Sequence, residues 1–96
     1  MSVDNEMIPL DLSFRAEITR DKNSGWPCVQ MPNSAELLGT GKAIRVLARI
    51  SGSDYEATML PVGNGVHMLP LRANFRREHA LEVGQHVDVQ LQYRKR

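Results

Sequence analysis

Four side chains of this 96-residue chain have the chemistry for nucleophilic catalysis or for a metal site. Cys28 is the only thiol, and His67, His79 and His86 are the histidines. A cysteine nucleophile needs a base that a third group orients, and no motif joins these residues. Zinc ligands occur in closely spaced pairs, whereas the intervals here are 39, 12 and 7 residues. The sequence therefore predicts a buried structural role for Cys28, a solvent-facing or strand-facing His67, no catalytic residue, no metal and no cofactor.

Two further features have a chemical and a structural interpretation. The run Gly63-Asn64-Gly65 contains the glycines of a phosphate loop, but such loops lead into a helix and this run leads into a strand pattern. Asn-Gly favours the type I′ turn of a hairpin, which is the structure we expect. Asp54 and Glu56 flank a second hairpin, and we expect them to be exposed rather than paired for acid and base catalysis.

Trp26 is the most ambiguous residue of the chain. It lies between Gly25 and Pro27, and its ring can pack against a hairpin or stack on a ligand at a barrel mouth. If the chain binds a small ligand, the residues that the sequence favours for this site are Trp26, His67 and Arg76.

Arginines provide the only pattern for nucleic-acid binding. Arg45 and Arg49 share a strand face, and Arg72 and Arg76 share a helix face. The net charge of the chain is +1, and without the basic residues 94–96 the remaining body carries nine basic and eleven acidic residues. An acidic body disfavours binding to a polyanion, so we expect these arginines to form surface ion pairs.

Composition indicates one small domain. Apolar residues make up 42% of the chain and charged residues 24%, which is typical of globular proteins. A single cysteine, no recognisable signal peptide and no apolar run of about 20 residues predict a cytoplasmic protein that does not cross a membrane. We expect a flexible arm over residues 1–11, a β-barrel domain over residues 12–93 and a basic tail over residues 94–96.

The hydrophobic pattern predicts a mainly β fold built from a repeated β-β-α-β unit. Alternation predicts six strands over residues 12–19, 26–31, 44–50, 55–60, 66–69 and 87–93, with helices over 35–38 and 71–80. Each half has a short strand that ends in a proline step, Met31-Pro32 or Leu69-Pro70. Six short strands have too many edges to stay open, so we expect a barrel that two short helices cap. The predicted core comprises Phe14, Ile18, Ile44, Val46, Ile50, Met59, Phe75, Val87, Val89, Leu91 and Tyr93.

Several motifs resemble the bacterial domain-of-unknown-function family DUF1905. They are Gly25-Trp26-Pro27, Leu38-Gly39, the strand start at Ile44, and the run TMLPVGNGVHMLPL over residues 58–71, with Arg76 and Gly84 in place. This resemblance covers residues 14–91 and implies a six-stranded double-split barrel. The second half is also similar, more weakly, to the swapped-hairpin fold of transition-state regulators and antitoxins, which complete their barrel from two chains.

The chain carries both halves, so we expect a monomer or a weak dimer. The sequence favours a non-enzymatic interaction or small-ligand-binding module, whose partner it does not identify. The alternative is a nucleic-acid-associated regulatory protein, and a hydrolase or transferase that uses Cys28 or a histidine ranks third.

Overall fold

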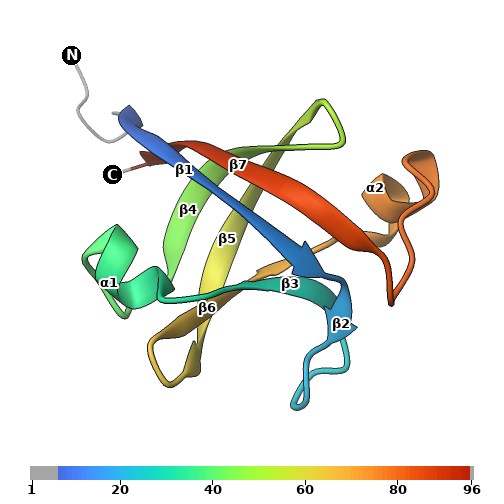
Figure 1. Cartoon of the computed structure of the whole chain (residues 1–96), viewed down its shortest axis with the longest axis horizontal. Helices are drawn as coiled ribbons and strands as arrows, with labels where there is room; N and C mark the ends of the chain where they lie inside the picture. The colour runs from blue at the N-terminus through green and yellow to red at the C-terminus, as the bar shows by residue number, and fades with distance from the viewer. Residues whose placement is uncertain (1–6, 96) are drawn as a thin grey trace.

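A computed structural model describes residues 7–95, which form a curled half-barrel of seven antiparallel strands with two short helices (Figure 1). The predicted mainly β class is confirmed. In chain order the elements are β1 (Met7–Glu17), β2 (Thr19–Arg20), β3 (Pro27–Met31), α1 (Ser34–Leu38), β4 (Ile44–Ile50), β5 (Ser53–Gly63), β6 (Val66–Pro70), α2 (Ala73–Glu78) and β7 (His86–Lys95). The strand order across the sheet is β1-β7-β4-β5-β6-β3-β2.

The first predicted strand is divided at Ile18, which is why seven strands are found where the pattern indicated six. Ile18 N–H donates to the carbonyl oxygen of Gln85 at 2.8 Å, and Gly84 N–H donates to Ile18 O at 2.8 Å. Beyond this residue the chain changes partner: β1 pairs with β7, and β2 pairs with β3. The sheet curls because one continuous segment therefore supplies both of its edges.

Strand pairing follows one pattern in both halves of the chain. The first strand of each half pairs with the last strand of the other half, β1 with β7 and β5 with β4. The last strands, β4 and β7, pair with each other, and so do β3 and β6. The two halves are thus interleaved rather than side by side.

Local backbone geometry agrees with the predicted turns. Asn64 and Gly65 have φ angles of 56° and 75°, so the turn between β5 and β6 is the type I′ turn that Asn-Gly predicts. The second helix is shorter than the expected 71–80, because Arg72 is still extended (φ −67°, ψ 148°) and Ala80 has φ 53°.

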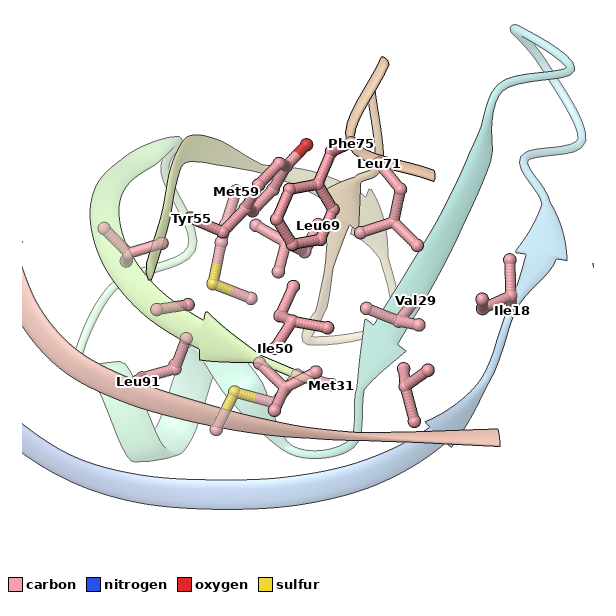
Figure 2. Packing of buried hydrophobic residues seen from close by; sticks show 14 of the residues in the cluster. Ile18, Val29, Met31, Ile50, Tyr55, Met59, Leu69, Leu71, Phe75 and Leu91 are labelled. Carbon is pink, nitrogen blue, oxygen red and sulfur yellow. The ribbon is translucent and has the colours of Figure 1, made fainter. Parts of the chain in front are cut away.

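The core lies inside the curl of the sheet (Figure 2). Most of its side chains come from the strands that lie between the two edge strands, β1 and β2. Every predicted core residue is buried except Phe14, which is half-buried on β1, and Tyr93, which is 38% exposed on the outer face of β7. Tyr55 is the buried tyrosine instead, and its ring centroid lies 4.4 Å from that of Phe75.

Both chain ends are more structured than expected within residues 7–95. β1 begins at Met7 rather than at residue 12, because Leu10 packs against the core along with Leu12. Residues 1–6 of the expected arm lie outside the described residues. In the expected tail, Arg94 and Lys95 are the last two residues of β7. Arg94 donates to Leu38 O at 3.2 Å, and Lys95 forms an ion pair with Glu56. Residue 96 lies outside the described part.

Candidate functional site

The three residues that the sequence favours for a ligand site do not meet. His67 on β6 pairs with Met31 of β3, at the end of these strands that leads into α1. Trp26 precedes β3 at its other end, where Leu71 N–H donates to Pro27 O at 3.0 Å. Arg76 belongs to that second end too, because its Nε donates to Leu71 O at 3.0 Å. The structure thus groups Trp26 with Arg76 loosely and separates His67 from both.

His67 is completely buried, so the solvent-facing alternative for this residue is wrong. Its Nε2 lies 2.8 Å from Lys42 O, and since a carbonyl oxygen only accepts, Nε2 carries the proton. The Nδ1 atom then accepts from the Ser34 hydroxyl at 2.7 Å, and Ser34 Oγ accepts the His67 backbone N–H at 2.5 Å. These bonds tie α1 and the loop after it to β6.

A serine, a histidine and an orienting carbonyl are the parts of a nucleophile and its base, but the surroundings favour a structural role. Ser34 and His67 both have no exposed surface, so a substrate cannot reach the hydroxyl in this conformation. Every hydrogen-bonding atom of the pair is occupied within the protein. Sequence reasoning missed the role of Ser34 in this pair, because its partner lies 33 residues away on β6.

Cys28 is buried as well, as the sequence predicts. Burial raises the pKa of its thiol, and the negative charge of Asp21 adds to this effect, while a hydrogen bond with Thr19 opposes it. A raised pKa keeps the thiol protonated and unreactive near neutral pH. Within residues 7–95 no group of three or more histidine, cysteine and carboxylate side chains is arranged to hold a metal ion.

The turn before β3 holds Trp26 rigidly by its backbone. Asp21 Oδ2 accepts from Ser24 N at 2.8 Å, from Ser24 Oγ at 2.9 Å and from Asn23 N at 3.2 Å. The bonds from Ser24 are the main reason that the pKa of Asp21 is lowered. Asp21 N–H in turn donates to Trp26 O at 2.9 Å. The Trp26 ring is 54% exposed, so it is only partly packed.

The predicted arginines do not form a continuous basic face. Arg72 lies 4.4 Å above the Tyr55 ring, and Arg76 is bound to Leu71 O. Arg49 forms an ion pair with Asp54 at 3.2 Å and donates to Gly52 O at 2.5 Å. Arg45 is exposed on the same strand face. Of these four arginines only Arg49 forms an ion pair within residues 7–95, so the expected surface ion pairs are not found at Arg45, Arg72 and Arg76.

A groove of about 1240 Å³ lies where β1 and β7 pass the β4–β5 turn and the loop between α2 and β7. Phe14 and Leu81 border it, although their side chains pack against or in the core. Its polar lining includes the guanidinium groups of Arg15 and Arg49, the amides of Gln85 and Gln90, the His86 imidazole, the Asp88 carboxylate and two serine hydroxyls. Arg15 is bound to Asp88 at 3.1 Å across the β1–β7 pair. Sequence reasoning missed this groove, because segments 13–15, 49–52, 81 and 84–90 form it only after folding.

Two smaller hollows lie elsewhere on the surface. One of about 400 Å³ lies between β1 and β3 and is lined by Ala16, Glu17 and Gln30, among others. Another of about 590 Å³ runs beside α2 and includes Arg76 and Arg77. Neither α1 nor α2 is long or apolar enough to cross a membrane, and they are the only helices in residues 7–95.

Comparison with known proteins gives one match to a protein family. The family described as "Domain of unknown function (DUF1905)" matches residues 14–91, which run from β1 to β7 and include every residue of the groove except Ser13. No curated protein matches the chain.

Proposed function

The chain belongs to the DUF1905 family, whose description assigns no activity, and we propose that it is a non-enzymatic module that binds a small ligand in the groove beside the β4–β5 turn. The ligand class that fits the lining is a polar molecule with an acidic group, such as a carboxylate or a phosphate. Cytoplasmic location remains our proposal, since Cys28 is a free thiol.

The observation that carries this proposal is the pair of arginines at the groove. Arg15 and Arg49 each use part of the guanidinium on an aspartate, Asp88 or Asp54. A guanidinium has five N–H donors, so both keep donors for an anion. Gln85 and Gln90 add neutral hydrogen-bond donors and acceptors, which orient a bound ligand without reacting with it.

An enzymatic role has less support. The strongest nucleophile and base candidates, Cys28 and the Ser34–His67 pair, are buried away from the groove. His86 is the only titratable base in the lining apart from the carboxylate of Asp88, which is bound to Arg15. A single histidine without an oriented partner does not make a catalytic constellation.

Chemical-shift mapping tests the proposal directly. A ¹⁵N-labelled sample is titrated with a panel of small carboxylates and phosphates, and the expected result is saturable shifts at Gln85, Gln90 and the backbone of residues 49–52. Arg49→Ala should weaken this binding, whereas Arg45→Ala should leave it unchanged. These two arginines are a matched pair, because both are exposed on β4 and only Arg49 lines the groove. Shifts that gather at Trp26 and Arg76 instead would move the site to the α2 end of the molecule.

Nucleic-acid binding remains the second proposal. Its support is the set Arg45, Arg49, Arg72 and Arg76, of which Arg49 is paired with Asp54 and Arg72 is stacked on Tyr55. Oligonucleotides belong in the same titration panel. Shifts that spread over several arginines and vanish with added salt would favour this second role.

We also infer that the half-barrel is a duplicated, six-stranded double-split barrel. β5 pairs with β4 over its first part and with β6 over its last part. β1 and β2 do the same in succession, with β7 and then with β3. When β1 and β2 count as one strand interrupted at Ile18, the two halves have equal strand numbers and equivalent pairings.

A further inference from the structure

We propose that the free edge of β1 pairs with the β1 strand of a second copy of this chain, antiparallel and about a two-fold axis at Ser13. The proposal does not depend on ligand binding in the groove. It also leaves each half-barrel complete within its own chain.

The backbone of β1 has one side without a strand partner in residues 7–95. Ile18 directs both its N–H and its C=O toward the segment that enters β7. Since these groups alternate in direction along a strand, Ala16 and Phe14 also face β7, and Arg15 and Ser13 face away from it. The backbone groups of Ser13 and Arg15 are therefore available to an added strand.

The inward side chains of β1 are incompletely covered. Leu10, Leu12, Phe14 and Ala16 pack against the core but are only half-buried. On the neighbouring strand β7, Val87, Val89 and Leu91 are no more than 6% exposed. A row of apolar side chains along a free strand edge is surface that a further strand would bury.

The second half of the chain shows what is missing in the first. Tyr55 of β5 pairs with Ala48, Leu12 of β1 pairs with Leu91, and Ala48 pairs with Leu91, so Tyr55 and Leu12 hold equivalent places. Tyr55 is 2% exposed because Phe75 of α2 packs on it.

The first helix leaves Leu12 half-buried. α1 packs against β6 and buries Leu38 in the core, but its Leu37 is 53% exposed. Leu12 thus keeps exposed apolar surface, whereas Tyr55 in the equivalent place does not.

Charge complementarity identifies a second copy as the occupant. In an antiparallel self-pair centred on Ser13, Asp11 of each chain lies opposite Arg15 of the other, which gives two opposite-charge pairs. Leu12 then lies opposite Phe14, so half-buried apolar side chains also meet. The Arg15–Asp88 pair is highly exposed, so Arg15 can share a second carboxylate at little cost.

Other registers of the same pairing are unfavourable. A centre at residue 11 or at residue 15 places identical charges opposite each other. A centre at residue 14 places Asp11 opposite Glu17, and one at residue 12 places Arg15 opposite Pro9, which has no N–H. The charges of β1 therefore select one register.

The pairing is short, which sets its strength. β1 keeps its alternation through Asp11, but Pro9 has no N–H and ends the hydrogen-bonding edge on one side, and β1 approaches β3 beyond Ala16 on the other. An interface of this size belongs to the weak class, and we expect a dissociation constant of roughly 0.1 mM.

Sedimentation equilibrium of charge variants tests the proposal. The native chain should dimerise over a dilution series up to ~1 mM, and Asp11→Arg or Arg15→Asp should each be monomeric, because like charges then face each other. A mixture of these two variants should form a heterodimer, since opposite charges are restored at both places. Glu78→Arg, which makes the same charge change on exposed α2, should dimerise like the native chain.

A backbone variant tests the edge itself. Ser13→Pro removes an N–H that faces away from β7, so the fold should keep its melting temperature in dilute solution while dimerisation is lost. If that variant unfolds, the mixture of charge variants still decides. The proposal would be overturned if the native chain is monomeric at ~1 mM, or if the mixture of charge variants stays monomeric. It would also be overturned if the chemical shifts that change with protein concentration map to Leu37 rather than to β1.

Discussion

Tyr55 holds the start of α2 through Arg72 in two ways. Its hydroxyl oxygen accepts the Arg72 backbone N–H at 2.9 Å, and its ring lies 4.4 Å below the Arg72 guanidinium. The same hydroxyl donates to Pro70 O at 2.6 Å. Tyr55 lies on β5, and Figure 2 shows its ring beside that of Phe75, which belongs to α2. Since Arg72 directly precedes α2, one side chain positions this helix.

The first prediction is that Tyr55→Phe destabilises the fold by about 1–3 kcal/mol. The ring and its contact with Phe75 remain, but Arg72 N–H and Pro70 O lose their partner in a partly buried place. Urea unfolding measures the change. Tyr93→Phe is the control, because Tyr93 is 38% exposed and its loss of a hydroxyl should change stability by less than ~0.5 kcal/mol. Equal losses in both variants would contradict the role of the Tyr55 hydroxyl.

The second prediction concerns the buried pair Ser34 and His67. Ser34→Ala should cost about 2–3 kcal/mol, because the His67 backbone N–H and Nδ1 both become unpaired inside the protein. Ser53→Ala, at a half-exposed position on β5, should cost much less. Hydrogen exchange of the His67 amide gives an independent readout, since it should accelerate only in the Ser34 variant. Unchanged exchange would show that Ser34 does not protect this amide.

These two clusters show where sequence reasoning succeeds and where it stops. The strand Ile44–Ile50 was predictable to the residue, because its alternation is regular and glycines precede and follow it. The turn at Asn64 was predictable because its geometry depends on two adjacent residues. Contacts such as Ser34 with His67 were not, because neither residue carries a local sign of the other.

Strand ends were misjudged for a related reason. Residues Met7 to Asp11 contain a proline and one charged position, which locally resemble a loose arm, yet pairing with β7 makes them a strand. Arg94 and Lys95 likewise resemble a charged tail until Leu38 O and Glu56 are placed beside them. In both cases the deciding partner is distant in the sequence and close in the fold.

The third prediction is an acid-dependent loss of stability through Asp21. Bonds from Ser24 and Asn23 lower the pKa of the folded Asp21 carboxylate, so its contribution is fully present above the unfolded pKa of about 4 and is lost as pH falls through the lower folded value. Asp21→Asn should therefore lower the urea midpoint at pH 6, and the difference from the native chain should shrink toward pH 3. A difference that is constant with pH would mean that the charge of Asp21 is irrelevant.

The fourth prediction is that oligonucleotide binding is weak and unspecific. A free tail of three cations would neutralise about three phosphates and give a slope of log affinity against log salt of roughly −2 to −3. Lys95 is paired with the Glu56 carboxylate instead, so we expect a slope of about −2.

Fluorescence anisotropy with labelled duplex and single strands over several salt concentrations measures this slope. Glu56→Gln releases Lys95 from its ion pair and should steepen the slope. Asp54→Asn, on the same strand, is the comparison variant, because it frees Arg49 at a distance from the chain end. If the native slope already exceeds three charges, or if Arg72→Ala or Arg76→Ala lowers the affinity for one sequence only, the arginines of α2 and its approach form a specific site. The regulatory role would then rank above the ligand-binding module, because sequence preference requires contacts that a charged strand end cannot provide.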